Sequence, residues 1–77
     1  LGRVNLIVLN EPGSLGGLST AIAENMGNIS NLRIVNRSND FFEMALDIEV
    51  TSVKHLTNII AALRASPVIN SVERARG

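Results

Sequence analysis

The part of this 77-residue chain best suited to bind a ligand is the turn at residues 10–17, NEPGSLGG. Pro12 and Gly13 indicate a sharp bend, and Gly16 and Gly17 then fall in the first turn of a predicted helix, where each glycine costs about 0.8–1.0 kcal/mol relative to alanine. Bare backbone there opens the free N–H groups and the positive end of the helix dipole to a carboxylate. On spacing alone, close packing against a strand or another subunit explains the glycines at least as well.

The turn does not match the common phosphate-binding motifs. It lacks the Gly-x-x-x-x-Gly-Lys-Ser/Thr pattern of a P-loop. A dinucleotide-binding fingerprint would also need a third glycine and a later acidic residue for the ribose. The turn is therefore neither a P-loop nor a dinucleotide-binding motif.

Catalytic residues are not evident elsewhere. His55 follows Lys54 near the start of a second predicted helix, and no serine nucleophile is paired with it, so we predict a solvent-facing histidine. Glu43, Asp47 and Glu49 share one strand face, which a solvated, arginine-balanced surface explains. With no cysteine and no metal-ligand spacing, we expect neither metal nor cofactor, and no catalysis by this chain alone.

Composition limits the architecture to one small domain. A chain of 8.2 kDa buries only about 60% of its unfolded surface, so we expect marginal stability without added support. Seven basic and seven acidic residues cancel, which argues against nucleic-acid binding by bulk charge. No apolar run reaches the roughly 20 residues that span a bilayer. Because the chain begins with leucine, we expect residues 1–77 to be one domain excised from a larger protein, which a parent or a second copy would support.

Hydrophobic periodicity predicts six elements around an aliphatic core. The order is strand, helix, strand, strand, helix, strand, which indicates an α+β, ferredoxin-like βαββαβ sandwich. Its four-stranded antiparallel-type sheet would carry both helices on one face. The predicted ranges are residues 3–9, 14–26, 31–37, 41–50, 52–65 and 68–75.

The helices are expected to bury one stripe each. In the first helix the stripe is Leu15, Leu18, Ile22 and Met26, with Ser14 as N-cap and Gly27 just past the C-terminal cap. In the second, Ser52 is the N-cap. The stripe of that helix is Val53, Leu56, Ile60 and Leu63, widened by Ile59.

The strands alternate, and this predicts their register. Leu32 and Ile34 share the buried face with Met44 and Leu46 only if the loop at residues 38–40 has an odd length. Arg33 then lies diagonally between two acidic residues of the next strand. Alternation in the last strand is too weak to decide its buried face. The uncovered sheet face is expected to contain Asn5, Ile7, Arg33, Val35, Arg37, Glu43, Ala45, Asp47 and Glu49.

RNA-recognition domains share this element order, but they stack bases on aromatic residues of the two central strands. Only Phe41 is expected on the open face, because Phe42 points into the core. Base stacking is therefore not expected. Exposed arginines could still contact phosphates, and these are Arg33, Arg37, Arg64, Arg74 and Arg76.

The residues together resemble the ACT domain, a small regulatory module that often binds amino acids. The resemblance rests on the NEPG-x-L turn after the first strand and on residues 27–29, GNI. Residues 28–34 (NISNLRI) and the closing VI-x-x-V-x-R of residues 68–74 are similar to the C-terminal ACT domain of long RelA/SpoT-type (p)ppGpp synthetase/hydrolases, or GTP pyrophosphokinases. The family turn usually has Asp where this chain has Asn10, which removes a carboxylate that could pair with a ligand ammonium.

The resemblance implies a side-by-side dimer through sheet edges, with an amino acid at the interface. The turn of one copy would face the start of the second strand of the other. Backbone N–H groups would bind the α-carboxylate, amide side chains the polar atoms, and Leu15 and Ile29 an apolar side chain, with a branched chain favoured. The implied ligand-binding residues are Asn10, Pro12, Gly13, Ser14, Leu15, Asn28, Ile29 and Ser30.

The functional hypothesis is thus a cytoplasmic, non-catalytic regulatory module. It would bias its parent between (p)ppGpp synthesis and hydrolysis in the stringent response. The alternative is an interaction module without a small-molecule ligand, which docks to the parent enzyme, ribosomal RNA or tRNA. Salt dependence distinguishes the two, because phosphate contacts weaken steeply with salt.

Overall fold

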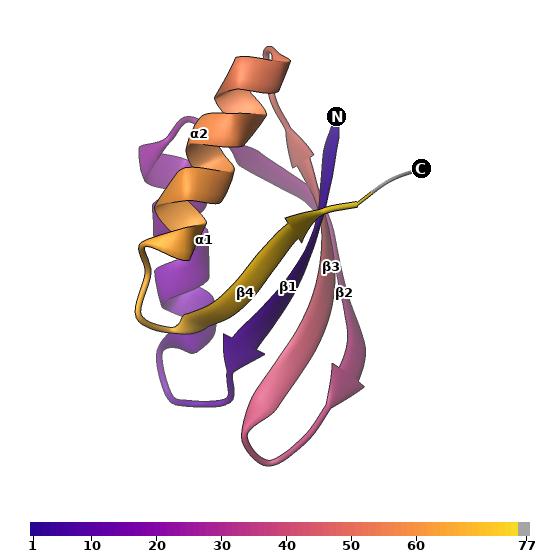
Figure 1. The fold of residues 1–77 in the computed structure, drawn as a ribbon, viewed down its shortest axis with the longest axis vertical. Helices are drawn as coiled ribbons and strands as arrows, with labels where there is room; N and C mark the ends of the chain where they lie inside the picture. Colours follow the sequence, from indigo (N-terminus) through magenta and orange to yellow (C-terminus); the bar gives the residue numbers. More distant parts are fainter. Residues whose placement is uncertain (76–77) are drawn as a thin grey trace.

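The computed structural model describes residues 1–75 and has the predicted element order (Figure 1). The elements are β1 (Gly2–Leu9), α1 (Ser14–Glu24), β2 (Asn28–Arg37), β3 (Phe41–Glu49), α2 (Val53–Arg64) and β4 (Ile69–Arg74). The sheet order is β2-β3-β1-β4, with every neighbouring pair antiparallel. Both helices lie on one face of this sheet, so the prediction of a ferredoxin-like sandwich is confirmed.

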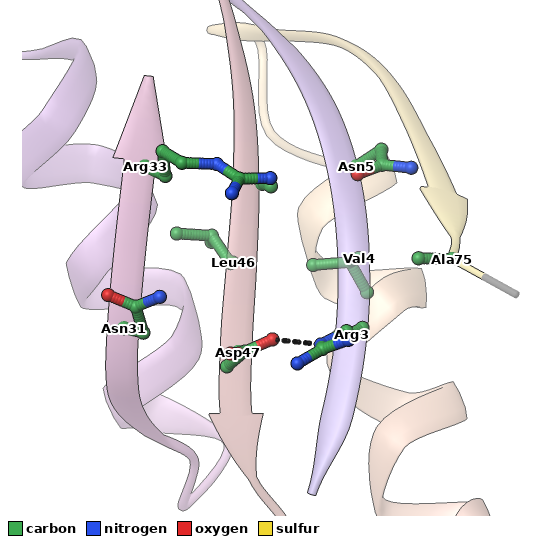
Figure 2. A pocket seen from close by; sticks show the side chains of 9 residues that line it. Arg3, Val4, Asn5, Asn31, Arg33, Leu46, Asp47 and Ala75 are labelled. Atoms are coloured by element: carbon green, nitrogen blue, oxygen red, sulfur yellow. Dashed lines mark hydrogen bonds and ion pairs between the residues drawn. The ribbon is translucent and has the colours of Figure 1, made fainter. Parts of the chain in front are cut away.

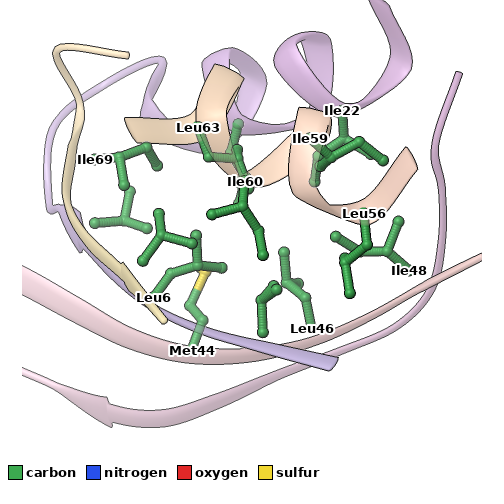
Figure 3. Packing of buried hydrophobic residues seen from close by; sticks show 14 residues of the cluster. Leu6, Ile22, Met44, Leu46, Ile48, Leu56, Ile59, Ile60, Leu63 and Ile69 are labelled. Atoms are coloured by element: carbon green, nitrogen blue, oxygen red, sulfur yellow. The ribbon is translucent and has the colours of Figure 1, made fainter. Parts of the chain in front are cut away.

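An aliphatic core lies between the sheet and the helices. Val4, Leu6 and Val8 of β1 are fully buried, as their alternation predicts. Figure 3 shows the side chains of Leu6 and Met44 on the sheet side of this core, with α2 packed above. Since α2 buries more of this core than α1 does, it is the main support of the sheet. Its four buried residues are Leu56, Ile59, Ile60 and Leu63.

The predicted register is confirmed in the middle of the β2–β3 hairpin. Leu32 pairs with Leu46 and Ile34 with Met44. Leu32 and Ile34 therefore face the helix side, but they are 40% and 38% exposed because β2 is the outer strand. The odd loop length predicted to cause this register is not its cause, because Arg37 pairs with Phe42 and four residues lie between them.

Two β-bulges interrupt β2. The register shifts between Ile29 and Asn31 and again between Ile34 and Asn36. Each extra residue turns the following side chains to the other face. Arg37 consequently pairs with Phe42, and its guanidinium lies 5.8 Å from the centre of that ring. The expectation that Arg37 lies on the open face is therefore wrong.

A third irregularity explains why the buried face of β4 could not be decided from the sequence. Val8 pairs with Ile69 and Ile7 with Ser71, so Asn70 is the extra residue. The buried residues of β4, Ile69 and Val72, are therefore three positions apart and do not alternate. Arg76 lies outside the described residues.

Three of the predicted helix details are wrong because apolar residues near the helix ends are exposed. Leu15, Met26 and Val53 are all exposed. The buried residues of α1 are Ser14, Leu18 and Ile22. The buried stripe of α1 thus begins at Ser14 and not at Leu15, while Met26 lies beyond the end of α1 and Val53 is the first residue of α2.

The end of α1 is a Schellman motif whose left-handed residue is Met26, with φ 64°. The Gly27 N–H donates to the Ile22 carbonyl at 2.9 Å, and the Met26 N–H donates to Ala23 at 3.0 Å. The predicted role of Gly27 is therefore wrong. A Cβ there would lie 2.8 Å from Ile22 and Ile59, so close packing requires this glycine.

Replacing Met26 by glycine should stabilise the fold. A left-handed non-glycine residue costs roughly 1–2 kcal/mol, part of which the greater freedom of glycine in the unfolded chain offsets. Because the Met26 side chain is 83% exposed, little packing is lost. We expect Met26→Gly to raise the free energy of unfolding by about 0.5–1 kcal/mol in urea denaturation. Met26→Ala keeps the left-handed strain and should give no gain in the free energy of unfolding. An alanine variant as stable as Met26→Gly would contradict this explanation.

His55 is not a free surface residue, contrary to the prediction. It is half-buried, and its Nδ1 accepts a hydrogen bond from the Thr51 N–H at 3.0 Å. The proton must then be on Nε2, which donates to the Asn25 carbonyl at 2.6 Å. Ser52 does cap α2, because its Oγ accepts from the His55 N–H at 3.1 Å. His55 thus joins the end of α1 to the start of α2.

His55→Ala should therefore lower the free energy of unfolding by about 1–3 kcal/mol, because it leaves the part-buried Asn25 carbonyl unpaired. The glutamine side chain of His55→Gln can restore the donor to the Asn25 carbonyl, and that of His55→Asn can restore the acceptor for the Thr51 N–H. Both variants should therefore lose less free energy of unfolding than His55→Ala. Chemical denaturation of the four proteins measures this order. A loss below about 0.5 kcal/mol, the range of an ordinary surface substitution, would contradict the bridging role.

Within residues 1–75, neither helix is long and apolar enough to cross a membrane.

Candidate functional site

The β1–α1 turn has the geometry of a donor site at a helix start. Gly13 has a left-handed φ of 85° and occupies the N-cap position. The Ser14 N–H donates to the Glu11 carbonyl at 3.2 Å, whereas Leu15 N–H and Gly16 N–H have no acceptor among the described residues. These two donors and the helix dipole favour a carboxylate.

Ser14 does not cap α1 as predicted. Its side chain turns inward and is 1% exposed, and its Oγ has no hydrogen-bond partner within residues 1–75. Buried polar atoms are rarely unpaired. The start of α1 thus retains one unmet hydrogen-bonding group besides its two free N–H groups.

Packing within the chain does not require a glycine at position 16. No atom lies within 4 Å of a Cβ built on Gly16, while one on Gly17 would make ordinary contact with Val68 at 3.5 Å. Within one chain, the helix–strand packing explanation therefore does not hold for Gly16. Leu15, beside it, is 42% exposed.

Asn10 fixes the turn to the neighbouring hairpin. Its Nδ2 donates to the Ser38 carbonyl at 2.9 Å, and its backbone N–H donates to the Asp40 carbonyl at 2.8 Å. One of its two side-chain N–H donors is thus occupied, and the other N–H and Oδ1 have no partner among the described residues. Pro12 is exposed in the same turn.

The other predicted half of the site is the start of β2. Asn28 is exposed, and its side chain forms no hydrogen bond with a described residue. Ile29 pairs with Ile48 and packs against the core, so only part of it can contact a ligand. Ser30 is the bulged residue, and its Oγ donates to the Asp47 carbonyl at 3.2 Å.

These two halves do not meet within one chain. The β1–α1 turn lies beside Ser38, at the end of β2, whereas Asn28 begins β2 opposite Glu49. A ten-residue strand spans roughly 30 Å. The sequence-predicted residues therefore form two half-sites at opposite ends of the outer strand (Figure 1).

The two sheet edges differ in their freedom to pair. On the β4 edge, Arg64 Nη2 of α2 donates to the Val72 carbonyl at 3.1 Å. The β2 edge is ten residues long, against six for β4, and exposes Leu32, Ile34 and Val35. A long edge with exposed apolar residues is a template for strand pairing.

Sequence reasoning did not find the hollows of the open sheet face. Figure 2 shows the hollow near Arg3 and Asp47, whose direct cross-strand ion pair has an N–O distance of 2.8 Å. In the same view the Arg33 side chain extends from β2 across β3. This hollow has a volume of about 260 Å³. Strand alternation alone would have placed the polar side chains of this hollow on one face. The side chains at the edges of the adjoining hollows depend on the bulges in β2 and β4, which alternation does not predict.

A βαββαβ chain with sheet order β2-β3-β1-β4 and both helices on one face has the ferredoxin-like fold. Residues 2–74 match the ACT domain family, and the chain belongs to that family. ACT domains are regulatory modules and commonly bind amino acids.

The chain is similar to part of the GTP pyrophosphokinases rsh of Brucella ovis and Brucella abortus (strain 2308). It is 40% and 39% identical to them, respectively, over 75 residues, or 97% of this chain. It spans 10% of the length of each relative. The resemblance to the ACT domain of this enzyme class is confirmed.

Solved structures show the same fold at lower identity. The crystal structure of the ACT domain from GTP pyrophosphokinase of Chlorobium tepidum has a TM-score of 0.80 and 22% identity, and covers 96% of this chain and 95% of that chain. The ligand-free regulatory subunit of aspartate kinase from Thermus thermophilus has a TM-score of 0.73 and 16% identity, and covers 97% of this chain and 50% of that chain.

Proposed function

We propose that this chain is a non-catalytic regulatory ACT domain that dimerises through its β2 edges and binds an amino acid between the two copies. Binding would bias a cytoplasmic parent GTP pyrophosphokinase between (p)ppGpp synthesis and hydrolysis. The similarity to the Brucella enzymes supports this parent. The observation that carries the proposal is the division of the site into two halves at opposite ends of the exposed β2 edge.

A two-fold axis through the β2 edge would unite these halves. When two copies of β2 pair antiparallel, the start of one strand lies beside the end of the other. The turn fixed to Ser38 by Asn10 then faces Asn28–Ser30 of the second copy. The dimer would thus have two equivalent sites, and each would be incomplete without the second copy.

The chemistry of the united site suits an aliphatic amino acid. The free N–H groups of Leu15 and Gly16 would bind the α-carboxylate at the positive end of α1. The Asn28 amide of the second copy and Asn10 Oδ1 would bind the polar atoms. The exposed Leu15 side chain offers an apolar wall, which favours valine, leucine or isoleucine over polar ligands.

The test is a thermal-shift screen of the twenty amino acids together with sedimentation. We expect a dimer of twice 8.2 kDa and a shift confined to branched-chain amino acids. A ligand at 100 times its dissociation constant adds about 2.7 kcal/mol, or several degrees for a domain of this size. Asn28→Ala should lose the shift, whereas Asn39→Ala, in the β2–β3 loop, should keep it.

Two results would contradict the proposal in different ways. A monomer at millimolar concentration would refute the paired edges. A dimer with a flat amino-acid screen would favour a docking module for the parent or for RNA, and RNA binding would then weaken steeply with salt. Regulation also requires that the ligand bind two states of the parent with different affinity.

A further inference from the structure

The open sheet face has a second hollow, of about 230 Å³, at the end nearest the β2–β3 hairpin. Its apolar surface comes from Ile7 of β1 and Phe41 of β3, and Phe41 is 38% exposed. Pockets that enclose drug-sized ligands measure roughly 300–1,000 Å³. This hollow is therefore sized for one ring system lying beside Phe41. Its lining residues are Ile7, Asn36, Arg37, Ser38, Phe41, Glu43 and Asn70.

Two bulges place amide side chains at the rim. Because the register shifts after Ile34, Asn36 pairs with Glu43 on the open face, whereas regular alternation would put it on the helix side. Asn70 is the extra residue of β4 on the opposite rim. Bulges frequently re-aim side chains next to functional sites.

The polar groups of the hollow are complementary to a particular pattern of donors and acceptors. Glu43 has no ion-pair or side-chain hydrogen-bond partner among the described residues, so its carboxylate is a free acceptor. Asn36 Oδ1 already accepts from the Arg37 N–H at 2.9 Å, which leaves its Nδ2 to donate. Asn70 adds a second exposed amide.

Guanine fits this pattern better than the other bases. Its N1–H and N2–H₂ are adjacent donors that one carboxylate can accept, and its O6 and N7 are acceptors for amide N–H groups. Adenine would present the N1 acceptor to the carboxylate. Unstacked bases commonly lie on aromatic side chains, as Phe41 permits. We propose that this hollow binds the base of a guanine mononucleotide.

Another hollow, lined by Arg33 and by the carboxylates of Glu43 and Glu73, adjoins the base hollow. It has a volume of about 420 Å³, shares Ile7 and Glu43 with the base hollow and extends to Asn5. Arg33 pairs with Ala45, the next open-face position after Glu43, and it forms no ion pair within residues 1–75. A guanidinium binds phosphate oxygens through paired N–H groups. The nucleotide would therefore lie along the open face with its phosphate at Arg33.

This site adjoins the proposed amino-acid site at Ser38, whose carbonyl accepts from Asn10, but its ligand-binding side chains are different ones. Pairing of β2 edges extends the sheet and leaves its open face uncovered. Loss of guanine binding would leave the amino-acid response intact, and a flat amino-acid screen would not affect this proposal.

The experiment is a ¹H–¹⁵N NMR titration of the 77-residue chain with GMP, AMP and guanosine. We expect GMP to shift the resonances of Asn36, Phe41, Glu43 and Asn70, and AMP to bind at least tenfold more weakly. Equal binding of GMP and AMP, or no shift with millimolar GMP, would overturn the proposal. A guanosine-containing single-stranded oligonucleotide that binds where GMP does not would assign the hollow to RNA and overturn the mononucleotide.

Variants then test each role separately. Glu43→Gln should weaken GMP binding at least tenfold and remove the preference over AMP. Phe41→Leu removes the ring from an exposed position and should weaken GMP roughly 5- to 150-fold. Arg33→Gln should weaken GMP but leave guanosine unchanged. Glu24→Gln, on the helix side, is the matched control and should bind as the wild type does. Binding of GMP by Glu43→Gln and Phe41→Leu at wild-type affinity would refute the site.

Discussion

Replacing Gly13 by valine is expected to abolish the amino-acid-induced thermal shift and to lower the free energy of unfolding by about 1–3 kcal/mol. Gly13 has φ 85°, a conformation that β-branched residues strongly disfavour. No atom lies within 4 Å of a Cβ at this position, so the strain is conformational and not steric contact with a neighbour. To relieve it, the turn would move and carry the Leu15 and Gly16 N–H groups away from the ligand. Urea denaturation and the amino-acid screen measure the two effects.

Two matched variants separate conformation from crowding. Gly13→Asn should retain most of the stability and the ligand response, because asparagine tolerates the left-handed region. Gly16→Ala adds a methyl group where the single chain has open space, and should raise the stability of the unliganded domain by about 0.8–1.0 kcal/mol. A Gly13→Val protein that responds to valine like the wild type would rule out the proposed role of the turn.

The sequence predicted the fold correctly wherever simple periodicity continues. Alternation placed Leu32 and Ile34 opposite Leu46 and Met44. The loop alone does not set that register, because Arg37 pairs with Phe42 and the bulge at Val35 then shifts the pairing by one residue. The same reasoning failed for Arg37, beyond the second bulge, and could not be applied to β4, where Asn70 separates the two buried residues. A bulge depends on pairing with a neighbouring strand, so the pattern within one strand does not reveal it.

Long-range contacts account for the other wrong details. Nothing near His55 in the sequence indicates that its ring reaches Asn25, 30 residues earlier, because the fold alone brings the end of α1 to the start of α2. Helical spacing likewise grouped Leu15 with Leu18 and Ile22, but Ser14 is the residue that is buried with them, and a polar residue gives no sign of this in the sequence. Periodicity defines a face, and the neighbouring element decides how much of that face is buried.

The candidate site was predictable only in part for a similar reason. Residue types identified the turn with Gly13 and the amide at Asn28, but the distance between them follows from the direction of β2. The hollow beside Phe41 was missed because Asn36 and Asn70 join it through bulges. Phe41 itself was correctly expected on the open face. The proposed ligand follows from the polar side chains beside it, Asn36, Glu43 and Asn70.

The paired-edge dimer leads to the second large effect. Leu32 and Ile34 are half-exposed on the helix-side face of the β2 edge, so a second β2 would bury them. Replacing both by lysine should raise the dimer dissociation constant at least 100-fold, or about 2.7 kcal/mol. Lysines on edge strands oppose strand pairing, because pairing would desolvate their charges, and a monomer tolerates them in water. Sedimentation should show the variant near 8.2 kDa at concentrations where the wild type is a dimer.

The control must be an apolar residue away from this edge that is at least as exposed as Leu32 and Ile34. Val53, at the start of α2, is 62% exposed, so Val53→Lys should leave the dimer unchanged. Because each ligand site needs Asn28 of the second copy, the Leu32→Lys/Ile34→Lys protein should also lose the valine response while its NMR spectrum remains that of a folded domain. If this monomeric variant still bound valine, the two half-sites would not need to meet and the turn alone would be the binding site. If it remained a dimer, the contact would lie on another surface, and the β2 edge would have no part in it.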